Sequence, residues 1–168
     1  MNDRDFVRSL GPAFLPHMLR RLSDLMVDGG TQWAARHPAI PPLRTHSTMF
    51  ALEQNGQLSV MQLAALLRQS HPLVLQWVGV LEKRGLVARQ RDPGDGRRTM
   101  LRLTDNGVAV MPAIHHARAV NEAVTRRLVA ELGDDLWERL RQLEALLAER
   151  PPVARMVEAA GMIEKDAA

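Results

Sequence analysis

Residues 58–107 carry patterns for two short helices and then a basic hairpin, and this order restricts the fold more than any other feature. Ser59, with Gln62 three residues later, is a capping-box arrangement typical of a helix start. A second helix is predicted from Ser70 to Gly85. Because the first helix is too short to be stable alone, its packing partners must lie close in space.

The segment after the second helix, residues 86–103, predicts two strands around the turn Asp92-Pro93-Gly94-Asp95-Gly96-Arg97. Residues 68–102 hold eight Lys and Arg against three acidic side chains, whereas the whole chain has a net charge of only +3. A basic segment on an otherwise mildly acidic chain is typical of a polyanion-binding face. The alternative is an ordinary solvated charged surface.

Composition limits the remaining possibilities. The chain has 168 residues, 46% of them hydrophobic, with no Cys, no Tyr and three Phe. Good helix formers dominate, which predicts a mainly α protein and disfavours a large β-sandwich. The absence of Cys excludes disulfides and thiolate metal sites. No stretch resembles a signal peptide or a membrane span, so we expect a cytoplasmic protein without membrane contact.

Helices are also predicted on both sides of this segment. Apolar residues spaced by three and four predict a helix over residues 5–28, ended by Gly29-Gly30, and a helix over 43–54. Thr104 is a plausible N-cap for a long helix over about 105–131, which Pro112 should kink. A last helix to about residue 150 carries a leucine seam made of Leu136, Leu140, Leu143 and Leu147. Residues 151–168 are predicted to be a short helix or a loose tail.

The terminal helices have more apolar surface than a small core needs, so we expect residues 5–28 and 105–150 to form a dimer interface. The alternative is that they fold back onto their own protomer. The predicted fold class is therefore mainly α with a small β-hairpin: a winged helix–turn–helix at about residues 43–104, flanked by N- and C-terminal dimerisation helices.

The second short helix has two distinct faces. Its predicted buried face consists of Val74, Trp77, Val78 and Leu81. The opposite face presents His71, Leu73, Gln76 and Lys83 among others. A helix with an exposed N-terminal end fits the DNA major groove, where Gln can pair with adenine, and its positive end favours phosphate.

These segments resemble one known family. Residues 59–67, the run Leu81-Glu82-Lys83-Arg84-Gly85-Leu86-Val87, the turn beginning at Asp92, and Leu103-Thr104 followed by Gly107 look like a MarR-type transcriptional regulator. The resemblance is close over the winged segment and extends by helix order over about residues 5–150. It implies that residues 1–168 are a single MarR-like domain. It also implies a homodimer that binds double-stranded DNA at a pseudo-palindromic operator, usually as a repressor released by a small aromatic or apolar effector.

The resemblance and the charge pattern together give a set of predicted DNA contacts. Arg97 would enter the minor groove, with Asp95 holding it by an ion pair and Asp92 supporting the wing. The expected base-facing residues are His71, Leu73 and Gln76, after the helix start at Ser70; the expected phosphate contacts are Lys83, Arg84, Arg89, Arg91 and Arg98. The family usually has polar or basic side chains where this chain has Leu73, Leu75 and Val80, so DNA shape and phosphates would carry much of the recognition.

An effector pocket is predicted from apolar residues with a polar partner for a carboxylate. Its residues would be Met18, Arg21, Trp33, His46, Met49, Phe50 and His115. The alternative is that these side chains simply pack the core. A zinc site involving His17, His46 and His115 or His116 is a weaker interpretation, so no metal or cofactor is expected.

No phosphate loop, nucleophile elbow or metal-ligand spacing is present in the sequence, so we do not expect an enzyme. The competing hypothesis is a winged-helix dimer that serves as a ligand-binding or protein-interaction module with altered or lost DNA binding. The apolar recognition face is the feature that supports it.

Overall fold

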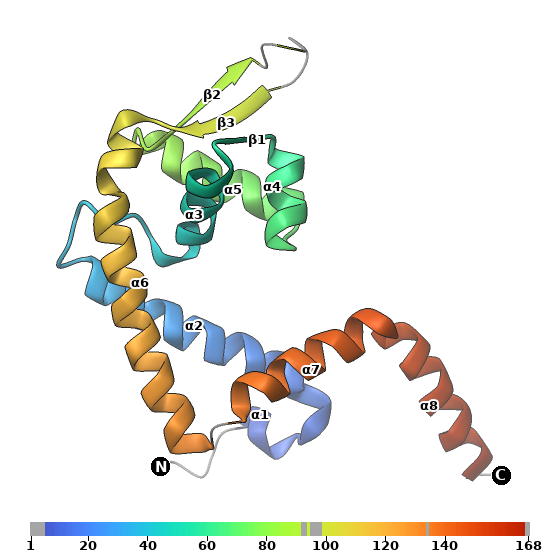
Figure 1. Ribbon diagram of the computed structural model, residues 1–168. Helices are drawn as coiled ribbons and strands as arrows, with labels where there is room; N and C mark the ends of the chain where they lie inside the picture. Colours follow the sequence, from blue (N-terminus) through green and yellow to red (C-terminus); the bar gives the residue numbers. More distant parts are fainter. Residues whose placement is uncertain (1–5, 92–93, 95–98, 134, 167–168) are drawn as a thin grey trace. The chain divides into compact units, whose positions relative to one another are not determined.

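The computed structural model describes residues 6–91, 94, 99–133 and 135–166. The chain divides into two compact units, Met1–Arg118 and Ala119–Ala168. Within the described residues the protein is mainly helical with a small antiparallel sheet (Figure 1), so the predicted fold class is confirmed.

The N-terminal segment is not the single helix predicted over 5–28. It consists of α1 (Phe6–Ser9), the short 3-10 helix η1 (Pro12–Phe14) and α2 (Leu15–Ala34). Gly11, at φ +75°, separates the first two elements. The helix also continues through Gly29-Gly30, contrary to prediction. A Cβ on Gly30 would lie 2.7 Å from Leu43 Cδ2, so this glycine permits close packing instead of ending the helix.

The next elements form the predicted winged helix–turn–helix (Figure 1). In chain order they are η2 (Leu43–Thr45), α3 (His46–Asn55), β1 (Gln57–Leu58), α4 (Val60–Leu67), α5 (His71–Lys83), β2 (Val87–Arg91) and β3 (Thr99–Leu103). The strands are antiparallel in the order β1-β3-β2. The sequence predicted only the hairpin of β2 and β3, because a two-residue strand shows no alternation of apolar and polar residues.

Local hydrogen bonds fix both ends of α4, including the turn that leads to α5. The predicted capping box is present: Gln62 N–H donates to Ser59 Oγ at 3.2 Å, and Ser59 N–H donates to Gln62 Oε1 at 2.8 Å. At the other end of α4, Arg68 adopts φ 50° and Gln69 N–H donates to the Ala64 carbonyl at 3.0 Å. This left-handed C-cap reverses the chain within a few residues and so sets the direction in which α5 starts.

The core lies between α3, α4, α5, the sheet and the first half of α6 (Asp105–Leu132). The predicted buried face of α5 is confirmed: Val74, Val78 and Leu81 are 0% exposed, and Trp77 packs against the same cluster. The opposite face of α5 therefore remains outside the core.

Thr104, the predicted N-cap, joins the start of α6 to the end of α5. Its N–H donates to the Leu86 carbonyl at 3.0 Å, and its hydroxyl donates to the Gly85 carbonyl at 2.6 Å. The same hydroxyl oxygen accepts the Gly107 N–H at 2.9 Å, which caps α6. Gly107 is buried, and a Cβ there would collide with the Leu86 carbonyl oxygen.

Replacing Gly107 therefore tests this junction. We expect Gly107→Ala to lower the free energy of unfolding by about 1–3 kcal/mol, because the backbone of Leu86 would have to move. Gly79→Ala is a matched control within α5, where a Cβ meets no atom within 4 Å; alanine should be neutral or slightly stabilising there. Urea denaturation of both variants measures the difference, and equal stabilities would contradict the proposed junction.

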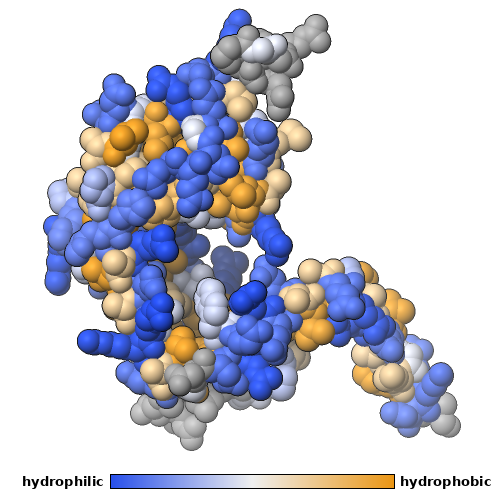
Figure 2. Space-filling view, in the orientation of Figure 1, coloured by the Kyte–Doolittle hydropathy of each residue, from blue (hydrophilic) through white to orange (hydrophobic). Residues whose placement is uncertain are grey.

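The second unit contains the end of α6, then α7 (Leu136–Glu149) and α8 (Pro152–Asp166). The last segment is thus a helix, one of the two predicted alternatives. Hydrophobic residues are exposed along α7 and α8 (Figure 2). Trp137 and Met156 are among the large exposed side chains of these helices. Among the described residues, no helix combines the length and the apolar character needed to cross a membrane.

Candidate nucleic-acid interface

The N-terminal end of α5 is exposed and available for contact with a partner. Ser70 is the N-cap residue in an extended conformation, and its side chain makes no capping hydrogen bond. His71 and Gln76 are exposed, whereas Leu73 is half-buried. The first backbone N–H groups of a helix carry partial positive charge and have no partner within the helix, so this end attracts anions such as phosphate.

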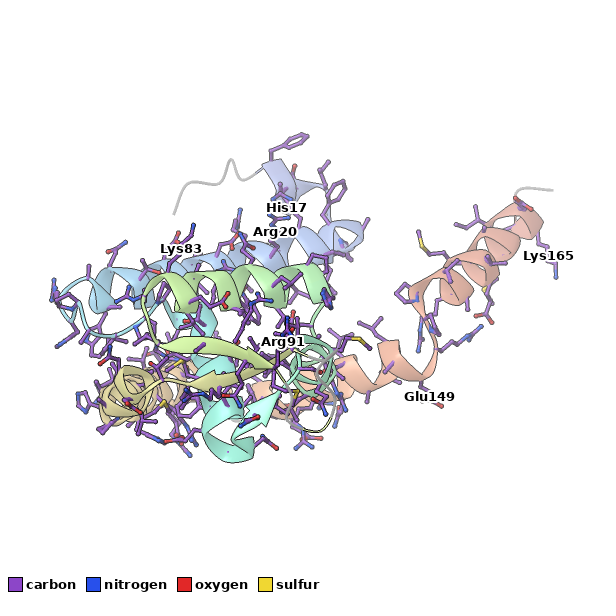
Figure 3. All side chains as sticks on the ribbon, turned by 90° about the horizontal axis from the view of Figure 1, so that it is seen from above. His17, Arg20, Lys83, Arg91, Glu149 and Lys165 are labelled. Carbon is purple, nitrogen blue, oxygen red and sulfur yellow. The ribbon has the colours of Figure 1, made fainter. Side chains whose placement is uncertain are left out.

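Two of the predicted phosphate contacts, Lys83 and Arg91, have exposed side chains. Figure 3 shows Lys83 at the end of α5 and Arg91 at the far end of β2. Within the described part of the chain, neither side chain has an ion pair. Both cations are therefore placed to meet a polyanion in solution.

Two other predicted phosphate contacts, Arg89 and Arg84, form hydrogen bonds with groups of the protein itself. Arg89 donates from Nε to Glu82 Oε1 at 2.8 Å and from Nη2 to Glu82 Oε2 at 3.3 Å, which ties β2 to α5. Arg84 donates from Nη2 to the carbonyl oxygens of Pro38 and Ile40 at 2.6 and 3.3 Å. Sequence spacing could not reveal either arrangement, because the partners depend on how the chain folds.

Two further exposed basic residues were not among the predicted contacts. Arg68 occupies the left-handed position in the turn before α5. Arg102 lies on β3, where its Nε donates to Gln90 Oε1 at 2.8 Å. Both belong to the basic segment, so the charge count was the sequence signal that could have identified them.

The tip of the wing carries four of the predicted site residues: Asp92, Asp95, Arg97 and Arg98. All four lie outside the described residues. The strands that lead to the tip are described, and they pair from Val87 opposite Leu103 to Arg91 opposite Thr99. The described stem of the hairpin therefore ends at the pair of Arg91 and Thr99.

The predicted effector residues lie on α2, α3 and α6, and some of them contact one another in pairs. Met49 is fully buried in the core. Arg21 Nη2 lies 3.7 Å from Met18 Sδ on α2, and the Trp33 ring lies 4.5 Å from that of His37. Phe50 instead meets the His115 ring edge-on at 5.1 Å. Met49 thus belongs to the core cluster and Phe50 packs against it, whereas Met18, Arg21 and Trp33 lie outside it.

A surface groove of about 600 Å³ lies elsewhere in the first unit. Of the predicted effector residues, only His115 lines it; the other lining residues include Leu52, Glu53, Arg102, Val108 and Met111. His115 Nε2 is 3.0 and 3.1 Å from the two carboxylate oxygens of Glu53. The lining of this groove is mainly apolar, and it includes the pair of Glu53 and His115.

His46 is buried at the start of α3, where its Nε2 lies 2.9 Å from the Pro41 carbonyl oxygen. Burial lowers the pKa of His46 below 6.5, and the hydrogen bond to Pro41 only partly opposes this shift. The histidine is therefore neutral in the folded protein at neutral pH and donates its Nε2–H to the carbonyl.

The lowered pKa predicts a pH-dependent stability. Because the unfolded chain binds the proton more readily, the contribution of His46 is complete above pH 6.5 and is lost as the pH falls through the folded-state pKa. Urea denaturation between pH 7.5 and 5 measures this loss. We expect His46→Gln to show a weaker decline than the unsubstituted protein, and an identical decline would contradict the assignment.

Comparison with known proteins gives a consistent result. Residues 40–98 match the family model described as MarR family. The search of curated proteins found no match.

Among solved structures, the chain is similar to the transcriptional repressor CouR bound to a 23-mer DNA duplex, with 27% identity and a TM-score of 0.62, covering 80% of this chain and 92% of that one. A mutant of E. coli MarR complexed with operator DNA has 18% identity and a TM-score of 0.64, covering 88% and 99%. PcaV from Streptomyces coelicolor, in complex with its natural ligand, has 22% identity and a TM-score of 0.62, covering 89% and 99%. The last two matches establish likeness of fold alone.

Proposed function

We propose that this chain, whose winged helix–turn–helix is of the MarR type, is a homodimeric transcriptional regulator that binds a pseudo-palindromic operator. The observation that supports it best is the division of α5 into a buried apolar face and a solvent-exposed face with an accessible N-terminal end. Each protomer would place this helix in the major groove, and the operator would repeat with the symmetry of the dimer.

The proposed contacts divide by chemistry. Ser70, His71, Leu73 and Gln76 would face the groove, and Lys83, Arg91 and Arg98 would meet phosphates. Arg97 would reach the minor groove, supported by Asp92 and Asp95. Because Leu75 is exposed and Leu73 half-buried, apolar contact with thymine methyl groups would replace hydrogen bonds at some base pairs.

The dimer interface would be built from the terminal helices, over residues 5–28 and 105–150. Exposed apolar side chains on α2 and α7 support this, among them Leu22, Leu25, Leu140 and Leu147. The regulator would act in the cytoplasm, on the nucleoid, as a repressor relieved by a small aromatic or apolar effector. The complex of PcaV with its natural ligand supports an effector only by likeness of fold.

Fluorescence anisotropy tests the proposal directly. The full chain is titrated against labelled DNA from upstream of its own gene and against a scrambled duplex, at two salt concentrations. A regulator binds the upstream DNA more tightly and loses affinity steeply with salt, because phosphate contacts release counterions. Absence of binding to upstream DNA and to a random-sequence library would instead favour a protein-interaction or ligand-binding module.

Removing one phosphate-binding cation should lower both the affinity for DNA and its dependence on salt. We expect Lys83→Ala and Arg91→Ala each to weaken binding to specific and scrambled duplexes alike, and to reduce the slope of log K against log salt by about 1. Lys165→Ala is the control, because Lys165 is an exposed cation of α8 and lies outside both proposed interfaces. Slopes unchanged in the first two variants would remove these residues from the interface.

A further inference from the structure

Arg84 follows directly after α5 and joins this helix to a distant loop. Its Nη2 donates to the carbonyl oxygens of Pro38 and Ile40, at 2.6 and 3.3 Å. Both carbonyls belong to the connection between α2 and η2, more than forty residues earlier in the chain. Ile40 is only 5% exposed, so one end of this connection is anchored in the body of the first unit.

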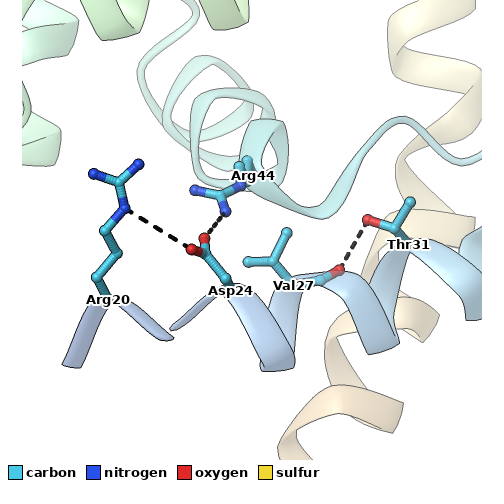
Figure 4. A network of polar contacts seen from close by, with 5 residues as sticks. All are labelled: Arg20, Asp24, Val27, Thr31 and Arg44. Atoms are coloured by element: carbon cyan, nitrogen blue, oxygen red, sulfur yellow. Dashed lines mark hydrogen bonds and ion pairs between the residues drawn. The ribbon is translucent and has the colours of Figure 1, made fainter. Parts of the chain in front are cut away.

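The same connection is held to α2 by a second arginine. Arg44 Nη2 donates to Asp24 Oδ1 at 2.8 Å, and Arg20 approaches the other carboxylate oxygen of Asp24 at 3.9 Å (Figure 4). Leu43 also packs against α2, in the space left by the missing side chain of Gly30. Residues 38–44 therefore lie between α2 and α5, with an arginine contact on each side.

We propose that Arg84 is a positioning residue for DNA binding and does not act as a phosphate ligand. Together with Arg44, it sets the orientation of the recognition helix α5 relative to α2 through residues 38–44. This inference rests on the proposed function, and it revises the role predicted for Arg84 from the sequence. Turning Nη2 toward a phosphate would break both charge-assisted hydrogen bonds to the backbone carbonyls.

Through these contacts, a movement of α2 can change the orientation of α5. The C-terminal end of α5 is held on one side by Arg84 and on the other by the Gly85 and Leu86 carbonyls bound to Thr104. A displacement of α2 that moves residues 38–44 must either shift the end of α5 or break the Arg84 contacts. Recognition of a specific duplex requires one orientation of α5, whereas non-specific attraction to phosphates does not.

The salt dependence of binding distinguishes a positioning residue from a phosphate ligand. We expect Arg84→Ala to weaken binding to the specific duplex by about three- to thirtyfold. Its affinity for the scrambled duplex and its salt slope should stay unchanged. Arg84→Lys should not restore specific binding, because the shorter lysine side chain does not bring its ammonium group to the two carbonyls that Arg84 Nη2 reaches. A slope reduced by about 1, with rescue by lysine, would overturn the proposal.

A double variant tests whether Arg84 and Arg44 act on α5 through the same segment, residues 38–44. Arg44→Ala removes the contact with α2 while leaving the charge of Arg84 in place. If both arginines act through the same segment, the double variant loses less specific affinity than the product of the two single losses. Fully multiplicative losses would show that the two contacts act independently and would contradict the path.

Hydrogen exchange provides a readout that does not depend on DNA. In the unsubstituted protein, Ile40 N–H donates to the His37 carbonyl and Thr45 N–H donates to the Pro42 carbonyl. Arg84→Ala should speed exchange in the peptide covering residues 37–45, and Arg91→Ala should leave it unchanged. Unchanged exchange in Arg84→Ala would refute the inference. A failure of the unsubstituted chain to bind any DNA would refute the proposed function alone.

Discussion

The hydrogen bonds of Thr104 hold the end of the recognition helix to the start of the long helix, and the rest of the first unit depends on this junction. The Thr104 hydroxyl caps α6 and donates to the Gly85 carbonyl, and the Thr104 N–H donates to the Leu86 carbonyl. The close approach leaves no room for a side chain at Gly107. Two glycines and one threonine therefore fix where α5 ends, where β2 begins and where α6 starts.

The two ends of α5 differ in how many contacts hold them to the rest of the first unit. The C-terminal end is bound to α6 through Thr104, to β2 through Glu82 and Arg89, and to residues 38–40 through Arg84. The N-terminal end is held by the short turn after α4 and presents His71 and Gln76 to solvent. A helix anchored at one end and exposed at the other can present backbone N–H groups and side chains to DNA without losing its own support.

The sequence predicted the elements that depend on local chemistry. The capping box at Ser59, the N-cap at Thr104 and the buried face of α5 all follow from patterns within one or two helical turns. The predictions failed where partners come from distant segments. The helix α2 continues through Gly29 and Gly30, and Leu43 packs against Gly30 from a later segment. Arg84 donates to carbonyls of residues 38–40, which no local pattern indicates. The directions of the predicted effector side chains also depend on tertiary packing, and of these residues only His115 lines the groove.

The most direct test of this account is to map backbone amide protection when the full chain is saturated with DNA from upstream of its own gene. If α5 reads DNA, new protection appears at residues 69–76, where α5 begins, and in the β2–β3 hairpin, with little change in α4 and α8. Binding that protects neither the start of α5 nor the hairpin would contradict the claim that this helix reads DNA.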